Sequence, residues 1–124
     1  KLFQEDLDIY QMKSSLMKNA QVYRDTAIAV ADGNISNARV VVAQTADDLL
    51  LVHGVKASFV LSSVQGSVHI SARSYGEYNV EVIMLALQGG GHRTMAGTQI
   101  ENVTIEEGIA LLKQAIDRYI EKNV

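Results

Sequence analysis

The sequence has 124 residues, of which 48% are hydrophobic and 20% are charged, and its net charge is −3. This length and apolar content predict one domain with a hydrophobic core and exclude intrinsic disorder, while the acidic balance disfavours a broad basic face for duplex nucleic acid. The absence of cysteine excludes disulfide bonds, thiolate metal sites and a cysteine nucleophile.

No apolar run approaches the ~20 residues that a membrane-spanning helix needs, and no basic stretch precedes a long apolar one as in a signal peptide. The chain begins with Lys1 rather than Met, so we expect it to be a piece of a longer protein. Residues 1–20 predict an amphipathic helix, because their apolar side chains recur at helical spacing. Those side chains are Phe3, Leu7, Tyr10 and Met17.

Two short apolar runs follow the first helix. Residues 26–31 predict a buried strand that ends at the turn signal of residues 32–34. The valine-rich residues 39–44 predict a second strand. Residues 45–52 resemble a helix with an N-cap and first-turn acids, closing at Gly54.

The middle of the chain predicts a hairpin and a helix. Residues 56–63 and 67–73 are β-type runs on either side of a Gln-Gly turn at residues 65–66. Asn79 can cap a helix over residues 80–87, because its side chain can accept hydrogen bonds from free backbone N–H groups.

The last part of the chain predicts a strand and a long helix. Residues 89–91 stop the preceding helix, and residues 95–100 predict a returning strand. Residues 104–107 form a capping box that opens a helix with one apolar face. That face carries Ile105, Ile109, Leu112, Ile116 and Ile120. The mixed order of elements predicts an α+β fold, with a mixed sheet of about five strands and helices packed on it.

The strongest chemical signal is the segment GGGHRTMAG at residues 89–97. Three glycines let the backbone take positive φ and approach a ligand closely, and successive free N–H groups in such a turn can bind an anion. His92 and Arg93 add a titratable donor and a fixed cation. The alternative is a helix C-cap followed by a surface loop, although one glycine suffices for a cap. The spacing fits neither a P-loop nor a dinucleotide-binding motif.

A second candidate is Arg73 with Ser74, at the end of a predicted strand and next to a turn, where ligand contacts often gather. The planar guanidinium of an arginine can bind phosphate through two hydrogen bonds. The alternative is a structural pair between Arg73 and a nearby acid such as Glu77.

The other polar groups favour structural interpretations. His53 and His69 have no partner at metal-ligand spacing. Asp47 and Asp48 suit a helix start, where acids interact favourably with the helix dipole. No serine stands in a Gly-x-Ser-x-Gly motif. The chain therefore offers one anion-binding candidate and no complete hydrolase.

The GGGHRTMAG segment resembles the glycine–histidine signature of the DHH-associated C-terminal domain, and residues 71–74, SARS, match the Ser-x-Arg-Ser element of that family. Within the family the chain is most similar to the GdpP type, the membrane-anchored cyclic-di-AMP phosphodiesterase of Gram-positive bacteria. Further matching segments are YRD at 23–25, ASFV at 57–60, ISARS at 70–74, NV at 79–80, VIM at 82–84, TQI at 98–100 and VTIEE at 103–107. The chain departs from the pattern at Gln88, where the GdpP type usually has a first glycine, and at Met95, where alanine is common.

The resemblance implies a two-domain enzyme. Residues 1–22 would be a linker helix from an upstream DHH domain, which would hold two manganese ions. Residues 23–124 would be the DHH-associated substrate-binding domain, with no metal and no catalytic residue of its own. The implied substrate-binding residues are Arg73, Ser74, Gly89, Gly90, Gly91, His92 and Arg93.

The implied reaction is the hydrolysis of cyclic di-AMP to pApA, by a protein anchored in the bacterial cell membrane with this domain in the cytoplasm. Two other functions stay open: a DHH family nuclease or phosphatase that acts on short oligonucleotides or pAp, with this domain as a nucleic-acid-binding module, and an interaction domain that forms a homodimer. The acidic balance favours a small nucleotide, because the few basic residues between positions 26 and 100 suffice for one or two phosphates. They are Arg39, Lys56, Arg73 and Arg93.

Overall fold

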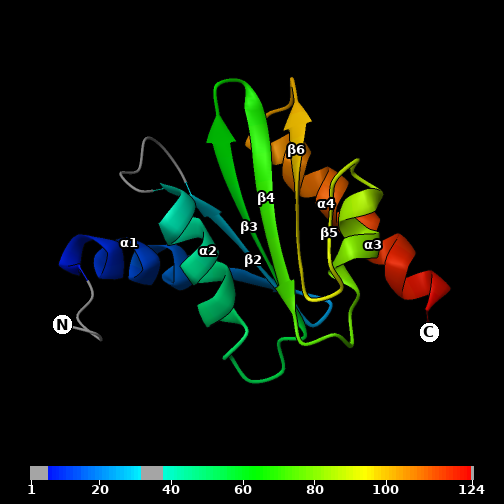
Figure 1. Ribbon diagram of the computed structural model, residues 1–124, viewed down its shortest axis with the longest axis horizontal. Helices are drawn as coiled ribbons and strands as arrows, with labels where there is room; N and C mark the ends of the chain where they lie inside the picture. Colours follow the sequence, from blue (N-terminus) through cyan, green and yellow to red (C-terminus); the bar gives the residue numbers. More distant parts are fainter. Residues whose placement is uncertain (1–5, 32–37, 124) are drawn as a thin grey trace.

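The computed structural model describes residues 6–31 and 38–123, which form one mixed sheet with helices on both faces (Figure 1). The helices are α1 (Leu7–Lys18), α2 (Ala38–Leu49), α3 (Val80–Leu85) and α4 (Ile105–Lys122). The strands are β1 (Gln21–Tyr23), β2 (Thr26–Ala31), β3 (Ala57–Val64), β4 (Ser67–Ser74), β5 (Gly90–Gly91) and β6 (Met95–Glu101). The predicted α+β class is confirmed, with a sheet of six strands where the sequence predicts about five.

The strands lie in the order β1-β2-β3-β4-β6-β5. Strands β2 and β3 pair in parallel, and each of the other described pairs is antiparallel. A parallel pair needs a crossover, and α2 lies in the connection between β2 and β3. Strand β6 lies between β4 and β5, so it joins the two segments that the sequence singles out as ligand-binding candidates.

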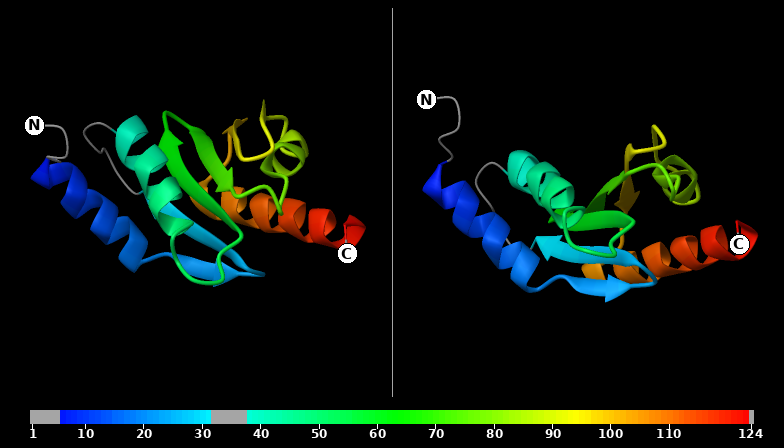
Figure 2. Two further views of the ribbon diagram at one scale, coloured as in Figure 1. Left: turned by 60° about the horizontal axis from the view of Figure 1, so that its bottom comes forward. Right: turned by 90° about the horizontal axis from the view of Figure 1, so that it is seen from below.

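Each face of the sheet has its own helices and its own core (Figure 2). Helix α4 begins with the predicted capping box between Thr104 and Glu107. Its buried side chains, together with those of α3, enclose a core with Phe59 and Ile70 of the sheet. On the opposite face, α1 and α2 pack against β2 and against Val60 of β3.

Helix α2 covers only part of its face of the sheet. Alternate side chains of β4 point toward α4 and are buried, namely Val68, Ile70 and Ala72. The side chains between them point the other way and are partly exposed, namely His69, Ser71 and Arg73. Their partners in β6 are Gln99, Gly97 and Met95. These six residues form a surface beside α2 that we call the open face.

The predicted strand at residues 39–44 is wrong. These residues form the first half of α2, which continues without a break to Leu49. Valine favours strands, but the buried side chains recur at helical spacing and pack against the sheet. They are Val41, Val42, Thr45, Ala46 and Leu49. Burial against the sheet overrides local propensity here, and Thr45 lies inside the helix rather than at its start.

The sequence analysis predicts no strand at residues 21–23, where the structure has β1. Strand β1 pairs with β2 across Arg24 and Asp25, whose φ values of 51° and 64° make a tight turn. An Arg-Asp pair is a weak turn signal, so only the apolar second strand was predicted. The β3–β4 hairpin is confirmed, with left-handed φ at Gln65 and Gly66. Asn79 caps α3 as predicted.

Helix α1 packs against the rest of the structure, because Leu16 belongs to the core on the α2 side. The proposed division between a linker at residues 1–22 and a domain from residue 23 stays a prediction. Phe3 and the predicted turn at residues 32–34 lie outside the described residues. Within the described ranges, none of the helices combines the length and apolarity needed to cross a membrane.

Asp117 of α4 holds the β1–β2 turn. The hydroxyl of Tyr23 donates to both carboxylate oxygens of Asp117, at 2.8 and 2.9 Å, and Nη1 of Arg24 donates at 3.0 Å. The Tyr23 hydrogen bonds, with Arg24, hold the pKa of Asp117 below its ordinary value. The same bonds raise the pKa of Tyr23. An ionised Asp117 therefore stabilises the fold.

We predict that Asp117→Asn lowers the free energy of unfolding near neutral pH. The depressed pKa of Asp117 gives stability that is present above its unfolded value, about 3.9 for a model Asp, and that is lost as the pH falls through the folded value. The difference between wild type and variant should therefore shrink below about pH 4. Chemical denaturation across this pH range measures the difference, with Glu106→Gln, which removes an exposed carboxylate from the first turn of α4, as a control. A difference that does not change with pH would contradict this account of Asp117.

Candidate functional site

Arg73 lies at the end of β4 on the open face, and its side chain is 13% exposed. Its Nε donates to Oδ1 of Asp47 at 3.1 Å, and its Nη1 donates to the carbonyl of Ala72 at 2.9 Å. A guanidinium has five N–H donors, and these two contacts occupy two of them. The Arg73 side chain is thus held in one orientation while an edge of its guanidinium can still bind an anion.

The acid that pairs with Arg73 differs from the one that the sequence suggests. Glu77 instead forms an ion pair with Lys56, with 2.9 Å between Oε2 of Glu77 and Nζ of Lys56. Asp47 does not stand at a helix start, because α2 is one continuous helix and Asp47 lies in its last turn. The helix dipole disfavours a carboxylate there, and the Arg73 guanidinium compensates for this. The long-range pair could not be found from sequence, because it depends on α2 being correctly assigned.

Ser74 and Arg93 join two loops beside this site. The hydroxyl of Ser74 donates to the carbonyl of Arg93 at 3.1 Å, and Nε of Arg93 donates to the carbonyl of Gly76 at 2.6 Å. The Val80 N–H also donates to the Arg93 carbonyl, at 3.0 Å. Both predicted binding residues therefore connect the loop after β4 with the β5–β6 turn, and any contact of theirs with a ligand stays a prediction.

Within the glycine segment, Gly90 and Gly91 form the short strand β5, and anion binding by this segment stays a prediction. Of its three glycines, Gly91 alone has a positive φ, at 145°. The N–H of Gly89 donates to Met84 and the N–H of His92 donates to Met95, at 2.8 and 2.7 Å, so neither is free for an anion. The expectation of a run of free N–H groups is therefore wrong at these two positions.

The glycines are needed for a close approach between β5 and β6. An added Cβ at Gly89 would overlap the carbonyl oxygen of Gly97, and one at Gly91 would lie 2.5 Å from the Cα of Ala96. A Cβ at Gly90 would meet nothing within 4 Å. The outer two glycines thus let β5 lie against β6, while the middle one faces open space.

This approach brings the two candidate segments onto one surface. Arg73 is the register partner of Met95, and Met95 exchanges backbone hydrogen bonds with His92. Residues directly opposite each other in an antiparallel pair share a face of the sheet. A row therefore crosses the open face at the C-terminal end of β4, formed by Arg73, Met95 and His92. Both His92 and Met95 are exposed.

The two other histidines lie apart in the part of the chain that the structure describes. His53 is exposed in the turn after α2, and His69 lies on the open face. Among the residues that the structure describes, no three His, Asp, Glu or Cys side chains come together as ligands. The resemblance places the two manganese ions in an upstream DHH domain, and that expectation stays a prediction.

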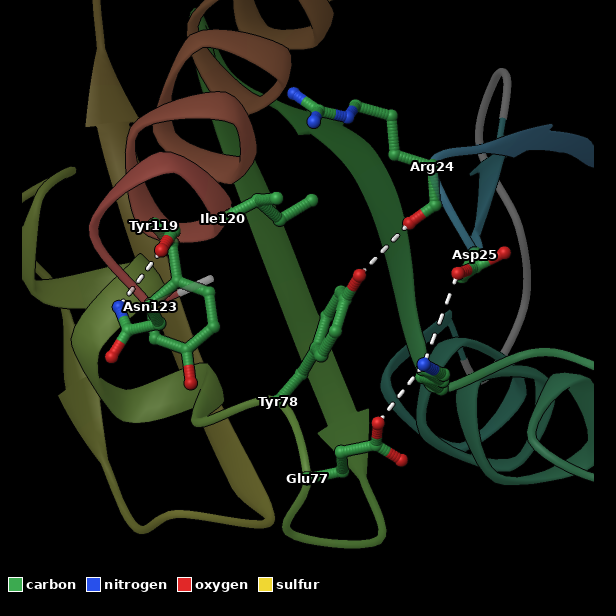
Figure 3. A pocket seen from close by; sticks show the side chains of 8 residues that line it. Arg24, Asp25, Glu77, Tyr78, Tyr119, Ile120 and Asn123 are labelled. Atoms are coloured by element: carbon green, nitrogen blue, oxygen red, sulfur yellow. Dashed lines mark hydrogen bonds and ion pairs between the residues drawn. The ribbon is translucent and has the colours of Figure 1, made fainter.

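A cavity of about 380 Å³ lies away from the row, between the β1–β2 turn and the end of α4 (Figure 3). Its polar groups bind one another: Lys56 pairs with Glu77 and Asp25, at 2.9 and 3.9 Å. The Tyr78 hydroxyl donates to the carbonyl of Arg24 at 3.2 Å, and the Tyr119 hydroxyl accepts from the N–H of Asn79. These contacts hold the loop that follows β4, and none of the predicted binding residues lines the cavity.

Comparison with known proteins decides the family. The model of the DHHA1 domain family matches residues 25–122. The chain belongs to the DHHA1 family.

Two curated relatives of this DHHA1 domain are cyclic-di-AMP phosphodiesterases. GdpP of Geobacillus thermodenitrificans is 45% identical over 98% of the chain, and PdeA of Listeria monocytogenes is 42% identical over 93%. The chain spans about a fifth of the length of each, 19% and 18%. In fold, it is similar to an exopolyphosphatase-related protein from Bacteroides fragilis, with a TM-score of 0.83 at 20% identity, over 94% of this chain and 36% of that one.

The first departure from the expected motif has a structural consequence. Gln88 has a φ of 65°, in the left-handed region that favours glycine. It follows α3 at the point where the N–H of Gly89 returns to the carbonyl of Met84. In the DHHA1 domain Gln88 thus closes the turn that follows α3, which leaves Gly89 and Gly91 for the contact with β6.

We predict that Gly91→Ala destabilises the domain and Gly90→Ala does not. A Cβ at position 91 would meet backbone atoms of β6 and occupy a backbone conformation that side chains rarely adopt, a strain of about 1–3 kcal/mol. The free energy of unfolding, measured for both variants, tests this, because they differ by one position and add the same methyl group. Equal stability of the two variants would contradict the close approach of β5 to β6.

Proposed function

We propose that this chain is the substrate-binding part of a metal-dependent phosphodiesterase that hydrolyses cyclic di-AMP to pApA. The observation that carries the proposal is the row of Arg73, Met95 and His92 on the open face. It places a fixed cation and a titratable donor on one accessible surface. The two curated relatives, which are cyclic-di-AMP phosphodiesterases by name, support this choice of substrate.

In this proposal the unpaired edge of the Arg73 guanidinium binds phosphate oxygens, because a planar fork matches two of them. The contact with Asp47 fixes the side chain before the substrate arrives, so less conformational entropy is lost on binding. His92 lies two strands away in the same row and donates a hydrogen bond to the same phosphate or to its neighbour. The role of these residues is to bind and orient the phosphodiester.

The chemical step belongs to another part of the protein in this proposal. An upstream DHH domain would hold two manganese ions, which activate water and stabilise phosphoryl charge when bound. We also propose that the complete protein is anchored in the membrane. A nucleic-acid-binding role has less support, because the chain is acidic and a polymer of phosphates favours an extended basic track.

We predict that the 124-residue chain alone does not hydrolyse cyclic di-AMP. The described residues bring no metal-ligand group together, and the proposed role of the domain is binding. The test is to incubate the purified chain with manganese and cyclic di-AMP and to follow pApA by chromatography, with the complete enzyme at equal concentration as the positive control. Turnover by the chain alone, free of contaminating enzyme, would overturn the division of roles.

Substitution of Arg73 tests the phosphate contact. In the complete enzyme, Arg73→Ala should weaken substrate binding by about 1.5–3 kcal/mol, the range for hydrogen bonds to charged groups. Arg73→Lys should recover only part of this, because the planar fork is lost. KM and the melting temperature are measured together, and Arg39→Ala, which removes an exposed arginine at the start of α2, is the matched control. An unchanged KM in Arg73→Ala would contradict the proposed contact.

A further inference from the structure

Tyr75 is an aromatic side chain that the sequence interpretation passes over. It follows β4 directly, and 65% of it is exposed. Its hydroxyl nevertheless donates a hydrogen bond to the carbonyl of Leu50 at 2.8 Å. The far end of the ring is therefore fixed while much of the side chain faces solvent.

The hydrogen bond places Tyr75 beside Arg73. Leu50 follows the last turn of α2, which contains Asp47, the partner of Arg73. Asp47 and Leu50 are also joined by a backbone hydrogen bond of 3.2 Å. Arg73 and Tyr75 are thus both held by the same end of α2, two residues apart along the chain.

An exposed apolar side chain also lies beside this arginine. Met95, its register partner in β6, is 52% exposed. An exposed apolar side chain and an aromatic ring beside a cation suit a ligand that has both an anionic and a flat apolar part. An aromatic ring that is already ordered loses little further entropy when such a ligand stacks on it.

We infer that Tyr75 is the surface on which a nucleobase of the substrate stacks while Arg73 binds the adjacent phosphate. This inference rests on the proposed function and deepens it, because it assigns the base as well as the phosphate to this end of the open face. Stacking on an aromatic ring tolerates any base. Tyr75 therefore contributes affinity for a nucleotide over a plain phosphate ester.

The test uses the complete enzyme and two competitive inhibitors that differ only in the base: adenosine 5′-monophosphate and ribose 5-phosphate. Tyr75→Leu keeps apolar bulk but loses the ring, so the inhibition constant for the nucleotide should rise roughly 5- to 150-fold, the range for one stacked base. The constant for ribose 5-phosphate should not change. Tyr75→Phe keeps the ring and should retain most of the affinity for the nucleotide.

Tyr10→Leu is the matched control, because Tyr10 is 56% exposed on α1, and melting temperatures report folding. An equal loss for both inhibitors in Tyr75→Leu would show that Tyr75 only holds the loop, which would overturn the inference. No loss of affinity for either inhibitor would overturn it as well.

Arg73→Ala separates the two proposals. If Arg73→Ala weakens the binding of both inhibitors while Tyr75→Leu weakens the binding of neither, the phosphate site stands without the base site. If Arg73→Ala weakens neither, the proposed function itself fails at this residue.

Discussion

The approach of β5 to β6 is the constraint on which the open face depends. At Gly89 and Gly91 the two backbones lie too close for a side chain, so this edge of the sheet can form only with glycine at both positions. The turn that follows brings His92 back opposite Met95, and Met95 lies opposite Arg73. A cation from one strand and an imidazole from a segment about 20 residues later thus share one surface. The glycines act through geometry, and the polar side chains beside them are the candidate binding groups.

The second determinant is the end of α2. Its last turn and the residue after it provide both the carboxylate that fixes Arg73 and the carbonyl that fixes Tyr75. These two contacts order an arginine and an aromatic ring while leaving part of each accessible. A surface ordered in advance binds with a smaller entropic cost. The same helix leaves the rest of the open face uncovered, because it packs over β2 and β3.

Much of the fold follows from local patterns. The capping box at Thr104, the cap at Asn79 and the turn at Gln65 and Gly66 each satisfy or shape the backbone within a few residues, so their sequence signals are reliable. The valines of α2 mislead because their burial against the sheet, rather than their local preference, decides the structure. That error also misplaced Asp47. The pairs from Arg73 to Asp47 and from Tyr75 to Leu50 join residues about 25 positions apart, and no local pattern encodes them. The two candidate segments can be singled out from sequence, and their role in binding stays a prediction. The reason for the glycines required the distances to β6.

The account is tested most directly by a crystal structure of the complete protein with cyclic di-AMP, the proposed substrate, under conditions that prevent turnover. It predicts a phosphate of the ligand within hydrogen-bond distance of the Arg73 guanidinium, on the open face and within reach of His92, with the Asp47 contact retained. A ligand whose phosphates lie elsewhere, with the row of Arg73, Met95 and His92 exposed to solvent or covered by protein alone, would contradict it.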